Sequence, residues 1–148
     1  MRLIKRLKNL IGNKNKKNIK IKKVPAKQFR LQGKHLFLTY SQYKQKRERV
    51  LELLKEKLRP RVIDEFVIAT EEHGAGGEHV HVYVQLDKNC DIENKSRLDL
   101  EDKDGKRCHG NYQSCRSYRN VVGYIIKDGL AKVFTNKKLD EFGRELNA

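Results

Sequence analysis

The chain has 148 residues, which is enough for one domain with a hydrophobic core and too few for two domains of ordinary size. Lys and Arg total 34 and Asp and Glu total 19, so the formal net charge of +15 favours a polyanionic partner, nucleic acid ahead of anionic membrane. No apolar run approaches the length of a membrane span, and the three cysteines form no CxxC pair, which argues against a disulfide framework or a zinc knuckle.

The first 28 residues predict a basic, flexible arm, because Lys and Arg crowd this segment and no Asp or Glu occurs in it. Such an arm adds affinity for phosphates without reading sequence. Leucines and isoleucines at helical spacing among the first dozen residues leave a membrane-surface or partner helix open as an alternative. We expect the folded domain to span residues 29–136, and residues 137–148 to form a C-terminal tail or the start of a linker.

Hydrophobic periodicity and turn residues predict alternating strands and helices after the arm. The loop expected between residues 87 and 110 leaves room for a short edge strand. The order is that of an α+β fold, an antiparallel sheet of about five strands with flanking helices in the βαββαβ order of ferredoxin-like and RRM-like domains. The predicted elements are a strand over 34–41, a helix over 44–58, strands over 62–72 and 78–86, a helix over 115–127 and a strand over 131–135.

The strand expected over 78–86 has the clearest pattern, because alternate residues of a strand face opposite sides of the sheet. One side is apolar, and the other carries His79, His81, Tyr83 and Gln85. Imidazoles two residues apart project side by side and can share one metal ion. A carboxylate on the preceding strand suits Mg²⁺ or Mn²⁺ as a third ligand. Only one of Glu71 and Glu72 can face the histidines.

The helix expected over 115–127 separates an apolar side from a polar side. Tyr124 and Lys127 belong to the polar side, together with Asn120 and Asp128. Lys127 can lower the pKa of the Tyr124 phenol or hold a phosphate oxygen, and Asp128 can orient Lys127 or reach a metal. A tyrosine at the margin of a core is the plain structural alternative for Tyr124.

Three segments in register resemble motifs I, II and III of rolling-circle replication initiators: Phe37-Leu-Thr-Tyr-Ser41, His79-Val-His81-Val-Tyr-Val-Gln85 and Tyr124-Ile-Ile-Lys127-Asp-Gly129. The likeness is to the Rep proteins of geminiviruses, related circular single-stranded DNA viruses and phytoplasma plasmids. Residues 97–100 and 109–113 also resemble a segment that geminivirus Reps carry between motifs II and III. Ser41 departs from the proline usual in geminiviral motif I. The resemblance spans most of the expected domain.

The resemblance implies an HUH nuclease fold and a role for each motif residue. By this resemblance His79 and His81 are metal ligands, and the upstream carboxylate is Glu71 rather than Glu72. Tyr124 is the nucleophile and Lys127 is the motif III lysine. Asp128 is a possible further ligand. The implied cofactor is Mn²⁺ or Mg²⁺. The implied enzyme is a metal-dependent, sequence-specific endonuclease and nucleotidyltransferase. It nicks and rejoins single-stranded origin DNA through a 5′-phosphotyrosine, leaving a free 3′-OH for rolling-circle replication.

The resemblance also implies partners and a compartment. These are single-stranded DNA at a stem-loop origin, the host replication machinery and the helicase domain that follows the nuclease in this family. The location is the bacterial cytoplasm for a plasmid protein or the host nucleus for a viral one. Candidate DNA-binding residues are Phe37, Thr39, Tyr40, Gln85 and Arg97, with Phe37, Tyr40 and Tyr43 as stacking groups for unpaired bases.

Three other readings of the sequence stay open. A non-catalytic module that binds single-stranded nucleic acid would use the same sheet face and the basic arm. A zinc protein built on Cys108, His109 and the histidine pair would need a ligand spacing that matches no familiar zinc pattern. A peripheral membrane protein would depend on the amphipathic N-terminus alone.

Overall fold

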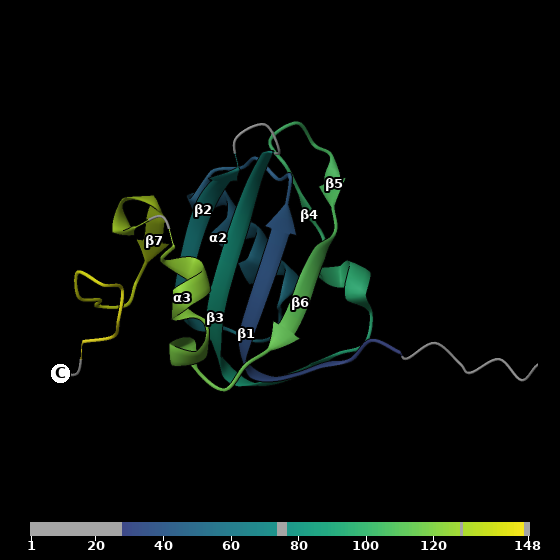
Figure 1. The fold of residues 1–148 in the computed structure, drawn as a ribbon. Coiled ribbons are helices and arrows are strands. Elements are labelled where there is room, and N and C mark those ends of the chain that lie inside the picture. Colours follow the sequence, from purple (N-terminus) through teal and green to yellow (C-terminus); the bar gives the residue numbers. More distant parts are fainter. Residues whose placement is uncertain (1–27, 74–76, 128, 147–148) are drawn as a thin grey trace, which may run out of the picture.

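The computed structural model describes residues 28–73, 77–127 and 129–146, with only the backbone described for residues 71–73, 77 and 131. The predicted N-terminal arm and Asp128 therefore lie outside the described residues. The central element is a five-stranded antiparallel sheet in the order β6-β1-β3-β2-β7 (Figure 1). This arrangement confirms the predicted α+β class. The strands are β1 (Leu31–Ser41), β2 (Ile63–His73), β3 (Gly77–Ile92), β6 (Gly110–Ser114) and β7 (Val133–Thr135).

One face of the sheet is sealed by helix α2 (Arg47–Lys57), which lies behind the sheet in Figure 1. Val50 and Leu54, one helical turn apart, point into the core and are fully buried. They meet the apolar face of the strands, to which β3 contributes Val80, Val82, Val84 and Leu86, all with 0% exposure. The alternation of β3 therefore directs one row of side chains into the core and the other to the opposite face.

The opposite face is covered in part by the segment between β6 and β7, which lies in front of the sheet (Figure 1). This segment holds the 3₁₀ turn η3 (Tyr118–Asn120) and the short helix α3 (Val122–Ile125). A second apolar cluster joins it to the sheet, made of Val67, Ala69, Tyr83, Tyr118, Val121 and Ile125. The cover is incomplete, because Asn111 and Gln113 on β6 remain exposed.

The helix predicted over 115–127 is the largest difference in secondary structure. The structure has a 3₁₀ turn followed by a single α-helical turn of four residues. Asn120 caps Ser117 through its side chain and starts a turn within the predicted helix. Val121, Val122 and Gly123 follow, and β-branched residues and glycine have low helix propensity. The predicted division into buried and exposed sides is correct, since Val121 and Ile125 are buried and Tyr124 is exposed.

Other boundaries shift because of pairings that the local sequence does not signal. Strand β3 runs on to Ile92, since its last residues pair with the start of β1. The edge strand β6 pairs with β1 and follows the segment predicted as a loop. That segment contains the 3₁₀ turn η2 (Lys95–Leu98) and the small ladder of β4 (Leu100–Glu101) with β5 (Arg107–Cys108). The short turn η4 (Leu130–Lys132) leads into β7.

Residues 137–146, which the sequence predicts as a tail or linker, fold back onto the domain. Leu139 packs against the second apolar cluster, and the Lys137 side chain is only 5% exposed. A turn closed by the backbone hydrogen bond from Asp140 N to Arg144 O, 2.8 Å, reverses the chain. This segment is therefore part of the layer in front of the sheet.

Candidate active site

The histidine pair lies near one end of the central strand β3. His79 and His81 share a face, and their ring centroids are 6.1 Å apart with the planes at 77°. His81 is nearly buried, at 9% exposure, and His79 is partly exposed. Val80, between them, is fully buried in the main core. The core side of β3 therefore fixes the direction in which both imidazoles project.

The register of β2 against β3 decides which of the two neighbouring glutamates shares the histidine face. Glu71 pairs with His79, and Glu72 pairs with Glu78. Directly paired residues of an antiparallel ladder lie on the same face. Glu71 therefore belongs to the histidine face and Glu72 to the other, in agreement with the choice of Glu71 that the family resemblance implies.

Strand β1 orients the His81 ring from the other side. Thr39 pairs with His81, and its hydroxyl oxygen lies 3.3 Å from His81 Nδ1. The Phe37 ring, two residues earlier on the same face, lies nearly parallel to the His81 ring, with centroids 5.9 Å apart and 10° between the planes. The His81 imidazole is thus held by a hydroxyl and an aromatic ring from one neighbouring strand.

Tyr124 reaches the same aromatic ring from the layer in front of the sheet. Its ring centroid lies 5.9 Å from that of Phe37, with the planes tilted by 40°. The phenol is 62% exposed, while Val121 and Ile125, on the other side of the turn, are buried. Packing of α3 on the sheet therefore brings Tyr124 to the histidine face and leaves its hydroxyl accessible.

The remaining candidates divide between the two faces. Lys127 is exposed three residues after Tyr124, and Gln85 lies on the histidine face two positions beyond Tyr83. Arg97 lies elsewhere: its Nε donates to Lys57 O at 3.0 Å, and its Nη2 contacts Arg59 O, at the end of α2. Arg97 therefore lies beside the end of α2, and its expected contact with DNA stays a prediction.

Two tyrosines that the sequence offers as base-stacking groups lie in the main core instead. Tyr40 and Tyr43 have 0% exposure. The Tyr40 hydroxyl donates to Leu98 O at 2.7 Å, and the Tyr43 hydroxyl donates to Glu101 O at 2.8 Å. Their expected role in stacking on DNA is therefore wrong. Tyr40 alternates with Thr39 along β1, so it must face the opposite side of the sheet.

Two residues of this face were not singled out from the sequence. Asn111 pairs with Thr39 and Gln113 pairs with Phe37 across β1 and β6, and both are exposed. Gln113 Nε2 donates to Asn111 Oδ1 at 3.0 Å. Their signal in the sequence is the alternation around the buried Tyr112, which marks residues 110–114 as a strand with one polar face.

The donor set fits a divalent cation at the level of strand positions. Among the side chains that the structure describes, no three His, Cys, Asp or Glu gather closely enough to hold a metal. The Glu71 side chain is outside that set, and its strand position completes two imidazoles and one carboxylate on one face. The imidazoles suit a divalent transition metal, and the carboxylate is a donor that Mn²⁺ and Mg²⁺ both accept.

The zinc reading finds no support at Cys108 and His109. Cys108 is buried, and burial raises the pKa of its thiol, which disfavours the thiolate form that binds zinc. His109 Nδ1 lies 2.7 Å from the buried carboxylate of Asp99, whose other oxygen accepts from the Tyr112 hydroxyl at 2.8 Å. These residues instead form a polar network that joins η2 to β6.

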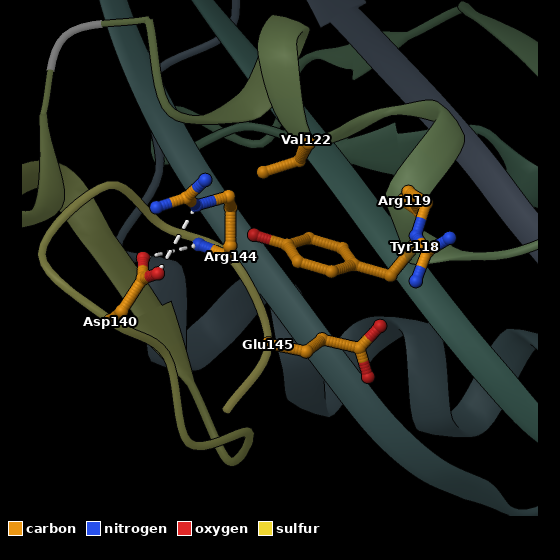
Figure 2. A pocket seen from close by; sticks show the side chains of 6 residues that line it. All are labelled: Tyr118, Arg119, Val122, Asp140, Arg144 and Glu145. Carbon is orange, nitrogen blue, oxygen red and sulfur yellow. Dashed lines mark hydrogen bonds and ion pairs between the residues drawn. The ribbon is translucent and has the colours of Figure 1, made fainter. Parts of the chain in front are cut away.

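A cavity of about 550 Å³ lies beside the Tyr124 segment, and its lining does not include the histidine pair. Figure 2 shows the Tyr118 ring at its centre, with Arg144 on one side and Arg119 on the other. The Arg144 guanidinium is already paired with Asp140, Nε to Oδ2, at 3.1 Å. The cavity is lined by residues of η3 and α3 and by the C-terminal residues Asp140, Arg144 and Glu145.

Comparison with known proteins agrees with this arrangement. A family model described as the geminivirus Rep catalytic domain matches residues 29–139. The chain belongs to this family. The family resemblance drawn from the three motifs is thereby confirmed, and the coarse function follows: this is a catalytic domain of the kind found in replication-associated proteins.

The Rep relatives come from plant viruses. Replication-associated protein A of Bean yellow dwarf virus is 39% identical over 104 residues, covering 70% of this chain and 34% of the relative. The protein of the same name from Tobacco yellow dwarf virus (strain Australia) is 40% identical over 104 residues, with the same coverage. The replication-associated protein of Cabbage leaf curl virus (isolate Jamaica) is 30% identical over 105 residues, 70% of this chain and 30% of the relative. The chain spans about a third of the length of these relatives.

No helix in the described part of this Rep domain is long and apolar enough to cross a membrane.

Proposed function

We propose that this domain nicks and rejoins single-stranded origin DNA through a covalent link to Tyr124. The observation that carries the proposal is the shared contact with Phe37. Tyr124 and His81, which lie on separate elements 43 positions apart, both have ring centroids 5.9 Å from that of Phe37. A nucleophile beside an imidazole pair that can bind a metal is the arrangement that phosphoryl transfer requires, because this chemistry depends on positioning and on charge stabilisation.

In the proposed step, the Tyr124 phenol loses its proton to solvent and its oxygen attacks the scissile phosphorus in line. The bond from phosphorus to the 3′ oxygen breaks, and that oxygen takes up a proton and leaves as a free 3′-OH. The fragment on the 3′ side of the nick remains joined to Tyr124 through its 5′ phosphate, as a phosphotyrosine. Since a phosphodiester is exchanged and none is hydrolysed, attack by a 3′-OH reverses the step and reseals the strand without ATP.

The other residues of the face have supporting roles in this proposal. Glu71, His79 and His81 would hold a Mn²⁺ or Mg²⁺ ion, which when bound supplies positive charge to the scissile phosphate. Lys127, close to Tyr124 in sequence, binds a phosphate oxygen. Phe37 and Thr39, with Gln85 further along the face, contact the DNA strand, and Asn111 and Gln113 extend this polar surface over β6.

We propose a stem-loop origin as the DNA substrate, with host replication proteins and a helicase domain as partners. The strand must be unpaired at the nick, because a base-paired duplex holds its phosphates where a tyrosine on a short helix cannot align with them. The plant-virus relatives favour the host nucleus as the compartment. The bacterial cytoplasm is the alternative if the protein is encoded on a plasmid.

The test uses a stem-loop oligonucleotide whose loop carries a TAATATTAC-like sequence, labelled at either end and incubated with Mn²⁺. We expect a denaturant-resistant protein–DNA band with the 3′-labelled strand and a released fragment with the 5′-labelled strand. Tyr124→Phe should bind the oligonucleotide and form no band. Tyr43→Phe is the matched control, since its hydroxyl serves only the core, and it should form the band. A band that persists in Tyr124→Phe contradicts the proposal.

The metal is tested separately from catalysis. EDTA should abolish the covalent band and added Mn²⁺ should restore it. In the absence of DNA, Mn²⁺ binding measured by electron paramagnetic resonance should be lost in His81→Ala and retained in His35→Ala. His35 lies on the same face with its Nδ1 2.8 Å from the Tyr83 hydroxyl, away from the pair. If the wild type binds DNA equally well with and without EDTA and forms no covalent band, the domain is a non-catalytic binding module instead.

A further inference from the structure

Helix α3, which carries Tyr124, cannot hold its place by itself. It consists of the four residues Val122–Ile125, and isolated helices shorter than about 12 residues are marginal in water. Its position must therefore come from contacts with neighbouring elements. Val121 and Ile125 supply an apolar contact with the sheet.

The C-terminal strap, residues 137–146, supplies a second set of contacts. The Tyr118 hydroxyl donates to Gly143 O at 2.7 Å, which ties η3 to the strap. Gly143 lies directly against the Ile126 side chain, two residues after Tyr124. The strap is itself folded, because Leu139 bridges to Glu145 and Leu146 N donates to Lys138 O at 3.0 Å.

Lys137 lies at the junction of the strap, the sheet and η3. Its Nζ is 2.5 Å from Glu65 Oε1 on β2 and 2.8 Å from Glu145 Oε2 on the strap. The same atom lies 6.0 Å from the ring centroid of Tyr83 on β3 and 5.4 Å from that of Tyr118 on η3. One ammonium group therefore contacts four parts of the chain, in a site where its side chain is 5% exposed.

Apolar packing alone does not account for how η3 and α3 are fixed to the strap. The cavity of about 550 Å³ shown in Figure 2 lies between Tyr118 and Val122 on one side and Asp140, Arg144 and Glu145 on the other. Contact between these two segments is interrupted there. Apolar contacts are also non-directional, whereas charge-assisted hydrogen bonds fix distance and orientation.

We propose that Lys137 is a positioning residue that fixes the Tyr124 segment over the histidine face. It does so by pinning the strap to β2 and by packing its ammonium group against the Tyr83 and Tyr118 rings. This inference rests on the proposed role of Tyr124. The ammonium does not touch the reacting groups: it acts through Tyr118 and the strap, which together hold both ends of α3.

The experiment compares Lys137→Met with Lys138→Met, which removes the neighbouring exposed ammonium from the same segment. The first measurement is hydrogen exchange at the Ile125 and Ile126 amides, which bond to Val121 O and Val122 O. The reference is the Leu58 amide, which bonds to Leu54 O behind the sheet. The second measurement is the single-turnover rate of the covalent band at saturating oligonucleotide, together with the Kd of the oligonucleotide.

In Lys137→Met we expect about 10-fold faster exchange at Ile125 and Ile126 and no change at Leu58. We also expect an approximately 10-fold slower covalent step and a Kd within about 2-fold of the wild type, since a misplaced nucleophile affects the reaction more than binding. Lys138→Met should match the wild type in every measurement.

Three results would overturn the inference: unchanged exchange at α3, an equal rise at Leu58, or faster exchange at α3 with an unchanged covalent rate. If the wild type forms no covalent band, the proposed function fails, and exchange alone decides whether Lys137 holds the segment. Glu145→Gln covers the case in which Lys137→Met does not fold, because it removes one of the two carboxylates and keeps the ammonium. It should change exchange and rate in the same direction by about 3-fold, and the absence of both changes would also overturn the inference.

Discussion

The Phe37 ring contacts both groups on which the proposed chemistry depends, with 5.9 Å from its centroid to that of His81 and 5.9 Å to that of Tyr124. It is nearly parallel to the imidazole and tilted by 40° from the phenol. Phe37 is only partly buried and packs against the second apolar cluster rather than the main core. Its position indicates that it sets the spacing between the imidazole and the phenol.

Phe37→Ala should therefore slow the covalent step by about 10- to 100-fold while leaving the domain folded, because small displacements of reacting groups have effects of this size. Phe37→Tyr retains the ring and should remain within about 3-fold of the wild type. Single-turnover assays with the 3′-labelled stem-loop provide the rates, and circular dichroism checks the fold. Equal rates for Phe37→Ala and wild type would remove Phe37 from the site.

Thr39→Val should weaken Mn²⁺ binding by about 10-fold, since a group that hydrogen-bonds a ligating histidine fixes its tautomer and ring orientation. The hydroxyl oxygen of Thr39 lies 3.3 Å from His81 Nδ1, and valine replaces that hydroxyl with a methyl group of similar size. Thr39→Ser keeps the hydroxyl and should bind Mn²⁺ as the wild type does. Isothermal titration calorimetry without DNA provides the affinities. Identical affinities for the valine and serine variants would show that the hydroxyl does not act on the metal site.

Gly143→Ala should lower the free energy of unfolding by about 1 to 3 kcal/mol. Gly143 has φ +79°, a conformation that favours glycine, and an added Cβ would overlap the Ile126 side chain. Gly123→Ala is the matched control, because nothing lies within 4 Å of its added Cβ and the residue is helical. The control should be neutral or stabilising by up to about 1 kcal/mol. Urea unfolding measures both, and equal stabilities for the two variants would contradict the predicted steric conflict.

Alkaline pH should destabilise the domain through its buried tyrosines. Burial raises the pKa of Tyr118 from 10.0 to about 12, and burial also raises the pKa values of Tyr40, Tyr43, Tyr83 and Tyr112. A pKa raised by folding gives stability that is complete below the unfolded value near 10 and is lost as the pH rises through the folded value. At pH 11 the loss should be about 1 kcal/mol for each buried tyrosine. Urea unfolding at pH 8 and pH 11 measures this loss of stability. In Tyr118→Phe the loss between the two pH values should be smaller by the contribution of one tyrosine, about 1 kcal/mol.

Alternation and motif spacing were sufficient to predict the parts of this domain that depend on local sequence. Strand β3, with its two faces, follows from the side chains of residues 78–86 alone. The choice of Glu71 over Glu72 came from the family resemblance, and the observed register agrees with it, because Glu71 pairs with His79. The exposure of Tyr124 also follows from helical spacing, although the observed helix is shorter than the predicted one.

The features that the sequence did not predict depend on contacts between distant residues. The extension of β3 to Ile92 requires the partner strand at Leu31–Gly33. Tyr40 faces the core because it alternates with Thr39 along β1, and its burial depends on α2 and on the segment that follows β3. The sequence places Lys137 in a charged tail. Its burial depends on two carboxylates at positions 65 and 145, which its immediate neighbours do not reveal. Nothing in its neighbouring residues marks it as buried.

The alternation of β3 couples the catalytic face to folding itself. Inserting a single residue between His81 and Val82 would put the two parts of the strand out of phase. If Val82, Val84 and Leu86 stayed in the core, His79 and His81 would turn toward α2, where Val80 now lies at 0% exposure. Such a chain would have to bury two imidazoles in the apolar core and expose Val80 to water. An insertion or deletion within this strand should therefore prevent folding, and the variant would be lost for that reason before its activity mattered. Insertions in the β2–β3 hairpin, by contrast, should leave the alternation of β3 side chains unchanged.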